Sequence, residues 1–177
     1  MKNKGFTLIE LMVVLVVMGI LIGIAAYSFT GIINNSRARG AADKIVQELQ
    51  GARERAYSRG HPVDVTFSAT AKGGVQMTVV FHTATGDETR PVSAFDECRL
   101  GLISAGVTKV PPDSGAAPSS GIYFTATGIP ANTCRFQPQG ASNTGSVYIK
   151  SLNGVYQYAV MANANGRVRR YTWTGTS

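Results

Sequence analysis

Three arginines stand within four positions near the end of the chain, in the stretch GRVRRYTW. Arg167, Arg169 and Arg170 are followed by Tyr171 and Trp173, and no acidic side chain lies nearby. A guanidinium group binds a phosphate through two parallel hydrogen bonds, and an exposed aromatic ring can stack on an unpaired base. The residue types therefore indicate a binding site for a polyanion.

The charge of the last third of the chain supports this interpretation. Asp113 is the last acidic residue, and a single-sign field over the remaining residues favours a polyanion or a membrane surface as partner. The alternative is that a chain with a net charge of +7 simply scatters its arginines over the surface. The basic residues after Asp113, of which the first two are candidates for extending the patch, are Arg135, Lys150, Arg167, Arg169 and Arg170.

The orientation of the tail decides whether its arginines can bind anything. In a regular strand Arg167 and Arg169 share one face with Tyr171 and Trp173, whereas Arg170 lies on the other face. If the aromatic rings close the core, a regular strand also turns the first two arginines inward, at a high cost in free energy. We therefore expect a twist or bulge after Arg170, with buried aromatic rings and exposed arginines.

The other end of the chain contains a candidate membrane segment. Lys2 and Lys4 precede an apolar run from Phe6 to Tyr27, which is close to the roughly 20 residues that cross a bilayer as a helix. Lysines before the run favour a cytoplasmic N-terminus. A simple signal anchor does not explain Glu10, because a carboxylate in lipid costs about 2.5–3.5 kcal/mol and needs a partner or a place near the interface.

The stretch KGFTLIEL around Glu10 resembles the type III signal of type IV pilins and type II secretion pseudopilins. The resemblance implies that the prepilin peptidase cuts between Gly5 and Phe6 and that Phe6 is then N-methylated. It also implies that Glu10 neutralises the N-terminal amine of a neighbouring subunit during filament assembly. We therefore expect a single-pass inner-membrane protein with a periplasmic globular domain, which later joins a pilus or pseudopilus filament at the cell surface.

Residues 34–60 continue the helix as an amphipathic segment. Alanine and aliphatic residues recur there at alternating spacings of four and three, which is a helical stripe. Glycines and the pair Asn34-Asn35 predict bending or local melting around residues 31–35, and Pro62 predicts the end of the helix near Gly60. The stripe consists of Ala38, Ala42, Ile45, Leu49, Ala52 and Ala56.

After Pro62 short β-branched and aromatic stretches alternate with Gly, Asn and Pro turns, which predicts an antiparallel β domain of about six to eight strands. The expected strands are residues 63–69, 75–82, 122–127, 147–152, 156–162 and 167–174.

The expected fold class is α+β: a long N-terminal α-helix, with a transmembrane half and an amphipathic half, packs on this C-terminal domain in two small sheets. The expected parts are a leader of residues 1–5, a transmembrane and assembly helix of 6–30, an amphipathic half of 31–60 and a globular β domain of 61–177 with a basic tail.

The stretch ADKIVQELQGARERAYSRGHPVDVTF resembles the GspH/FimT group of minor pilins and pseudopilins. In the FimT-like DNA-uptake pilins a C-terminal G-R-x-R motif is implicated in DNA binding, and residues 166–169 match it. The resemblance implies a minor type IV pilin that binds DNA nonspecifically through phosphate contacts and contributes to natural transformation. Arg170 is an addition to the motif.

Other functions are compatible with the same sequence. One alternative is a minor pseudopilin of type II secretion, similar to GspH, or a structural pilus-assembly subunit with protein partners only. Another is a surface protein that binds anionic glycans. In each case the expected partners include other filament subunits, the inner membrane and the prepilin peptidase.

Cys98 and Cys134 are the only cysteines. The expected location outside the inner membrane is oxidising, which favours a disulfide between them. Two buried free thiols are the alternative. His61 and His82 are far apart and lack metal-ligand spacing, so we expect neither a metal nor another cofactor.

Catalysis has little support in this sequence. Asp96-Glu97 is an acidic pair with no histidine nearby in the sequence, and no glycine-rich phosphate loop leads from a strand into a helix. We therefore expect the chain to be a substrate of the prepilin peptidase and not an enzyme.

Overall fold

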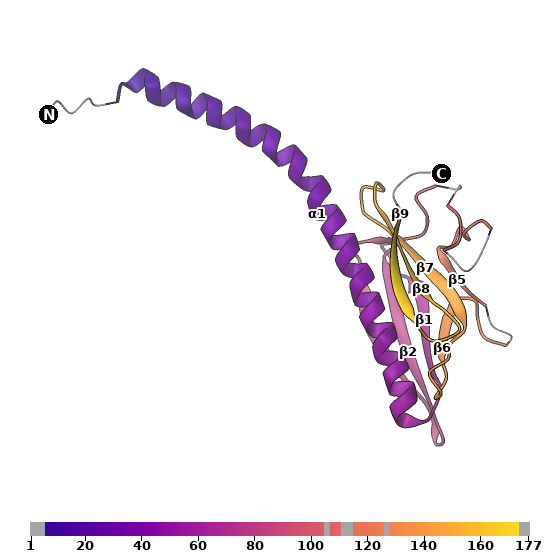
Figure 1. Cartoon of the computed structure of the whole chain (residues 1–177). Helices are drawn as coiled ribbons and strands as arrows, with labels where there is room; N and C mark the ends of the chain where they lie inside the picture. Colours follow the sequence, from indigo (N-terminus) through magenta and orange to yellow (C-terminus); the bar gives the residue numbers. More distant parts are fainter. Residues whose placement is uncertain (1–5, 105–106, 111–114, 126–127, 174–177) are drawn as a thin grey trace. The chain divides into compact units, whose positions relative to one another are not determined.

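The computed structural model describes residues 6–104, 107–110, 115–125 and 128–173, and for residues 25–28 and Ser93 it describes the backbone alone. The chain divides into two units, Met1–Ile33 and Asn34–Ser177, and each is described by itself. The long helix α1 (Leu8–Arg59) begins in the first unit and ends in the second (Figure 1).

The first turn of α1 has a reciprocal cap. Thr7 Oγ1 accepts a hydrogen bond from the Glu10 backbone N at 3.3 Å, and Glu10 Oε2 accepts one from the Thr7 backbone N at 3.5 Å. A threonine before the first turn and a glutamate three residues later form a capping box, which satisfies backbone donors that have no partner inside the helix. The sequence TLIE therefore marks the start of α1.

The predicted local melting around residues 31–35 is wrong, because α1 is helical without a break from Leu8 to Arg59. Asn35 can disrupt a helix by bonding to nearby backbone groups. Here its side-chain oxygen instead accepts a hydrogen bond from the hydroxyl of Tyr158, which lies 123 positions away in the sequence. This tertiary contact favours the helix over the local alternative.

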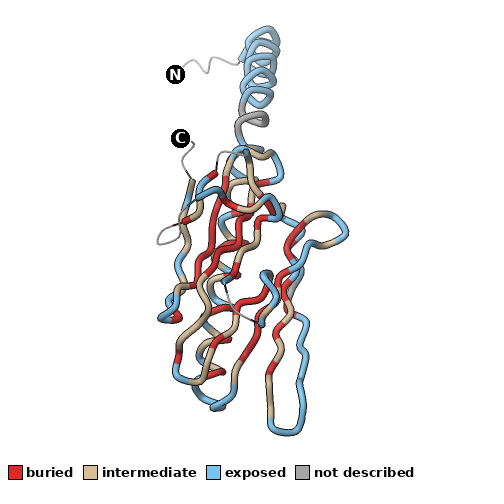
Figure 2. The backbone as a smooth tube through the Cα atoms, turned by 90° about the vertical axis from the view of Figure 1, so that its right-hand side faces the viewer, coloured by how far each residue is buried: buried red, intermediate tan, exposed pale blue. Residues whose placement is uncertain are grey.

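The second half of α1 contributes the centre of the main core. Its predicted stripe is confirmed, since all six predicted positions and Ala41 are fully buried. Small side chains along the stripe allow the helix to approach the sheets closely, and Ile45 and Leu49 fill the space between them. In Figure 2 the described residues near the N-terminus are pale blue and exposed.

The β domain consists of two antiparallel sheets, as predicted. The first has the order β3-β2-β1-β6 and is formed by β1 (Val63–Ala69), β2 (Val75–Thr83), β3 (Gly86–Phe95) and β6 (Thr133–Phe136). The second has the order β4-β7-β8-β9, with β5 also paired to β7, and is formed by β4 (Arg99–Leu100), β5 (Ile122–Thr125), β7 (Thr144–Lys150), β8 (Gln157–Ala162) and β9 (Val168–Trp173).

The second sheet packs on both faces. Along β8, Tyr158 and Val160 belong to the main core with α1, whereas Ala159 and Met161 point to the opposite face. On that opposite face the structure forms a smaller apolar cluster, which we call the outer cluster. It consists of Val107, Val110, Ala117, Tyr148, Ala159 and Met161, with Leu102, Tyr171 and Trp173 partly buried against it.

The predicted strands are confirmed to within a few residues, although residues 126–127 and 174 lie outside the described residues. Three observed strands were not predicted. Half of the residues of β3 are polar, and it contains Pro91, which is compatible with its position at a sheet edge. β4 and β6 have two and four residues, too few to show an alternating pattern.

The predicted disulfide is wrong, because Cys98 and Cys134 are free and buried. Cys134 pairs with Val65 in the middle of β1, whereas Cys98 follows β3 near the β1–β2 turn, where Leu100 N donates to Gly73 O at 3.0 Å.

Candidate nucleic-acid interface

The hairpin between β8 and β9 places the arginine-rich tail. Its turn is closed by Gly166 N, which donates to Asn163 O at 2.8 Å, and by Arg167 N, which donates to Asn163 Oδ1 at 2.9 Å. The loop before β7 holds the turn, since Ser142 Oγ donates to Asn163 O at 2.7 Å and Ser142 N donates to Ala164 O at 3.1 Å. Arg167 therefore follows a turn fixed by several hydrogen bonds.

The first residue of the G-R-x-R motif has a structural role. Gly166 is buried and has a φ of 69°, a conformation that side chains disfavour. A Cβ at this position would overlap the carbonyl oxygen of Gly140 and stand 2.8 Å from Arg53 Nε. That carbonyl accepts a hydrogen bond from Arg53 Nε at 3.2 Å. The hairpin, the preceding loop and α1 thus meet at a point where only glycine fits.

Arg167 and Arg169 are exposed. Among the residues that the structure describes, neither guanidinium group has a hydrogen-bond or ion-pair partner. Arg167 directly precedes β9, and Arg169 is its second residue. The two residues are therefore available to an anionic ligand.

Arg170 points the other way, toward α1. Its Nη1 lies 2.6 Å and 2.7 Å from the two carboxylate oxygens of Asp43, and its guanidinium lies 5.7 Å from the ring centre of Tyr158. Val168, on the same face of β9, packs against the main core. Arg170 therefore holds β9 to α1, and Asp43 balances its charge.

The two residues expected to extend the patch are also engaged. Lys150 Nζ donates to the carbonyl oxygen of Leu102 at 3.0 Å. Arg169 pairs with Met161 of β8, which pairs in turn with Ser146 of β7, so Lys150 lies four residues further along β7 from the level of Arg169. Arg135 lies in the first sheet and is bound by Asp64. The structure therefore brings Arg167 and Arg169 together but does not join the other three basic residues to them.

The predicted bulge after Arg170 is wrong, because β8 and β9 stay in register from Ala162 opposite Val168 to Gln157 opposite Trp173. A regular strand does not force Arg169 into the core together with the aromatic rings, since the face that carries Tyr171 and Trp173 is covered only by the outer cluster. Both aromatic rings are half-buried there, and an arginine on the same face stays exposed.

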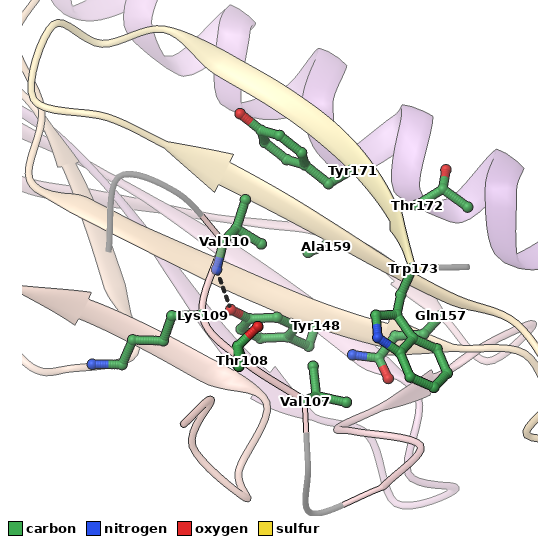
Figure 3. Close-up of a pocket in the computed structure, with 10 residues that line it drawn as sticks. All are labelled: Val107, Thr108, Lys109, Val110, Tyr148, Gln157, Ala159, Tyr171, Thr172 and Trp173. Carbon is green, nitrogen blue, oxygen red and sulfur yellow. Dashed lines mark hydrogen bonds between the residues drawn. The ribbon is translucent and has the colours of Figure 1, made fainter. Parts of the chain in front are cut away.

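A half-open groove with a volume of about 170 Å³ lies beside the tail, between β9 and residues 107–110 (Figure 3). Sequence reasoning missed this groove, because residues 107–110 carry no pattern that places them over β9. Val110 N donates to the hydroxyl of Tyr148 at 3.1 Å, which fixes the loop on the sheet. The lining includes Val107, Val110, Tyr148, Ala159, Tyr171 and Trp173.

Sequence reasoning also missed an ionic cluster on the first sheet. Asp64 accepts hydrogen bonds from Arg135 Nε and Nη2, both at 2.6 Å, and lies 3.0 Å from His82 Nε2. His82 Nδ1 lies 2.8 Å from Asp87 Oδ1. Burial alone raises the pKa of Asp64, but the hydrogen bonds and charges of Arg135 and His82 outweigh it and hold that pKa below 3.8. Cross-strand contacts bring these residues together, and no local motif marks them.

The pKa values of His82 and Arg135 shift in the opposite direction to that of Asp64. The hydrogen bond to Asp64 raises the pKa of His82 above 6.5, with a further contribution from Asp87. The hydrogen bond to Asp64 likewise raises the pKa of Arg135. The four residues therefore form a charged network that stabilises the outer face of the first sheet.

The processing and assembly residues lie at the start of α1. Phe6 and Glu10 are exposed, and Gly5 lies outside the described residues. Within the described part of the chain, α1 is the one helix whose length and composition allow a membrane span, with a mean hydropathy of 2.8 in its most apolar window. The apolar side chains of residues 6–24 are exposed in the isolated chain, as a membrane or assembly helix requires.

Two models of known protein families match this chain, one at its N-terminus and one over the second half of α1 and most of the β domain. A family model described as the prokaryotic N-terminal methylation motif matches residues 1–26, and one described as type II transport protein GspH matches residues 41–166.

The fold resembles a crystal structure of the minor pseudopilin EpsH from the type II secretion system of Vibrio cholerae, with a TM-score of 0.53 and 16% sequence identity over 81% of this chain and 99% of that chain. A second structure of EpsH is 17% identical over 77% of this chain and 97% of that chain, with a TM-score of 0.47. One long helix on two antiparallel sheets is thus a pilin-like fold. Because the GspH model matches well over half of its residues and a methylation motif precedes them, the chain belongs to the GspH family of pilin-like proteins.

Proposed function

We propose that this GspH-family protein is a minor pilin of the FimT-like type, which binds DNA through Arg167 and Arg169 and contributes to DNA uptake in natural transformation. The observation that carries the proposal is the contrast between these two exposed guanidinium groups, unpaired among the described residues, and the engaged Arg135, Lys150 and Arg170. The fixed turn at Asn163 and Gly166 holds both arginines at one end of the β domain, where a phosphate backbone can reach them.

The proposed contacts are to phosphate and carry no sequence information. Each neutralised phosphate releases condensed counterions, so that the logarithm of affinity falls with the logarithm of salt concentration with a slope of about −0.9 per contact on duplex DNA. Two arginines therefore predict a slope of about −2 and weak binding at physiological salt.

Removing both charges is expected to abolish DNA binding. The full chain in a non-ionic detergent is titrated against a fluorescently labelled duplex at low salt, and Arg167→Ala/Arg169→Ala should lose the anisotropy change of the parent. The matched control is Arg37→Ala/Arg39→Ala, which removes the same charge at the same spacing from exposed positions on α1. If the tail variant binds duplex as well as the parent, the proposal is wrong.

The second candidate function is a minor pseudopilin of type II secretion with protein partners only. The description of the matching family model and the likeness in fold to EpsH favour it. In this case Arg167 and Arg169 would meet carboxylates on a neighbouring subunit, and the parent chain would show no DNA affinity at low salt. A neighbourhood of secretion genes would support this candidate, whereas pilus and competence genes would support DNA uptake. Binding to heparin without DNA affinity would indicate an anionic glycan instead.

The N-terminal segment completes the proposal. We infer that prepilin peptidase cuts between Gly5 and Phe6, that Phe6 is methylated, and that α1 anchors the subunit in the inner membrane with a periplasmic β domain before it enters a filament. The methylation motif over residues 1–26 and the apolar first half of α1 support this inference. Glu10 would then exchange its capping contact with Thr7 for the amine of a neighbouring subunit.

Replacing Glu10 with alanine is expected to leave cleavage intact but to strongly reduce incorporation into filaments, because the neighbouring amine loses its counter-charge in lipid. The mass of the mature chain reports cleavage, and the amount of subunit in sheared filaments reports assembly. Thr7→Val is the matched control, since it removes the capping partner and keeps the carboxylate. Normal incorporation of Glu10→Ala would refute the charge-pairing role.

A further inference from the structure

The groove beside the tail has the size of a single aromatic ring. Its cavity measures about 170 Å³, and an apolar protein cavity of about 150 Å³ binds one benzene molecule. Tyr171 and Trp173 border it from β9, while Ala159 and Tyr148 lie on the sheet beneath, and Val110 lies on the facing loop (Figure 3). A planar six-membered ring therefore fits between aromatic and aliphatic surfaces.

One buried polar group of the groove has no partner for its donor atoms within the described part of the chain. Gln157 is 1% exposed and lines the cavity, and its Oε1 accepts a hydrogen bond from Ile103 N at 2.9 Å. This bond fixes which side of the amide is nitrogen, and the amide nitrogen has no partner among the described residues. A buried donor without an acceptor is destabilising. A ring that carries a carbonyl oxygen, such as a pyrimidine base, would satisfy it.

Positive charge lies at one rim of the groove. Arg169 is on the same face of β9 as Tyr171, two residues away, or about 6.8 Å along the strand. Lys109 lies on the facing loop, but its Nζ is 3.7 Å from the ring centre of Tyr123, which does not line the groove, so this charge is engaged elsewhere. Among the described residues, no acidic side chain lines the cavity. An apolar slot beside an exposed arginine matches an unpaired base with a flanking phosphate, and the bases of a duplex, stacked inside the helix, cannot enter it.

We propose that this groove binds one unpaired pyrimidine base of single-stranded DNA, stacked against Trp173, while Arg169 holds a neighbouring phosphate. The inference rests on the proposed function and makes it narrower, since it names the form of DNA that the protein prefers. Arg167 and Arg169 then supply the sequence-independent attraction, and the groove adds a preference for single strands rich in pyrimidine.

Trp173 is the only tryptophan in the chain, and its fluorescence therefore reports on the groove directly. Titration of the full chain in non-ionic detergent with oligo(dT) is expected to quench this fluorescence in a saturable way, because a base stacks on the indole ring. Oligo(dA) and duplex DNA of the same length should quench it much less at equal bound fraction. This measurement uses the parent chain and needs no variant.

Variants test the energetic contribution of the ring. Trp173→Leu is expected to weaken oligo(dT) binding about tenfold, measured by anisotropy of the labelled oligonucleotide, with duplex affinity unchanged. Tyr57→Leu is the matched control, because Tyr57 is a 73% exposed aromatic residue outside the groove. Tyr171→Leu provides a second groove variant, and thermal melting checks that each variant is folded.

The outcomes separate this inference from the proposed function. If duplex DNA binds but oligo(dT) neither quenches Trp173 nor binds more tightly than duplex, the groove inference is wrong and the phosphate-binding proposal stands. Equal quenching by oligo(dA) and oligo(dT) would overturn the assignment of a pyrimidine. If neither single-stranded nor duplex DNA binds the parent, both proposals fail.

Discussion

Replacing Gly166 with alanine is expected to lower the free energy of unfolding by about 2–4 kcal/mol, because the new Cβ adds backbone strain and steric overlap in one place. The strain comes from a φ of 69°, and the overlap is with the carbonyl of Gly140. Chemical unfolding of parent and variant measures the difference. Because the turn must shift, Arg167 moves as well, and DNA affinity should fall even though no charge is removed.

The chain contains a matched control for this substitution. Gly154, in the β7–β8 turn, has the same φ of 69°, but beyond its immediate chain neighbours nothing lies within 4 Å of the place that a Cβ would take. Gly154→Ala therefore has the backbone strain without the overlap and is expected to cost about 1 kcal/mol. Equal costs at Gly154 and Gly166 would show that the close approach to Gly140 does not matter.

Replacing Asp64 with asparagine is expected to lower the free energy of unfolding by about 3 kcal/mol, because it leaves Arg135 and His82 without their shared counter-charge in a largely buried position. The side chain of Asp64 is only 11% exposed. Asp87→Asn is the control, since Asp87 also contacts His82 but its side chain is 58% exposed. Such an exposed pair contributes at most about 1 kcal/mol. Similar losses in the two variants would contradict the central role of Asp64.

The same cluster predicts how stability varies with pH. The pKa of Asp64 is lowered on folding, so its contribution is present above its unfolded pKa and is lost as the pH falls through its folded pKa. The pKa of His82 is raised, so its contribution is present below its unfolded pKa and is lost as the pH rises through its folded pKa. The cluster therefore stabilises the domain most between about pH 4 and pH 6.5.

In Asp64→Asn the loss of stability at low pH that comes from Asp64 should disappear. The loss of stability as His82 is deprotonated should become smaller, because Asp87 alone remains beside His82. Melting temperatures measured across this pH range for parent and variant provide the test. An unchanged pH profile would show that another group controls the stability.

Local patterns predicted the elements of the fold well. The stripe from Ala38 to Ala56 requires only helical periodicity, and the six predicted strands require only alternating or β-branched residues with turns between them. The edge strand β3 was missed because its polar residues and Pro91 look like a loop, and a strand of this kind is defined by pairing with β2. The predicted disulfide failed because two cysteines in a sequence carry no information on their separation in space.

The candidate site was predictable only in part. The motif at Gly166 to Arg169 identified the two exposed arginines, but not the role of its glycine, which depends on Gly140. Arg170 forms an ion pair with Asp43, 127 positions away in the sequence, and is therefore not part of the predicted patch of exposed basic residues. The groove could not be predicted either, because it forms where residues 107–110 meet β9, more than 50 positions away in the sequence. Side-chain partners distant in the sequence decide which charges stay free.

The antiparallel pairing of β8 and β9 also determines how the domain would bear a mechanical load. Under the proposed function, a pull along β9 through DNA bound at Arg169 would act across six paired positions at once and shear them together, instead of opening them one after another. The Arg170–Asp43 ion pair joins the same strand to α1, and the contact of Gly166 with Gly140 and Arg53 provides a second anchor on that helix. Tension at the tail would thus pass into the helix through two separate routes, without relying on a flexible tether.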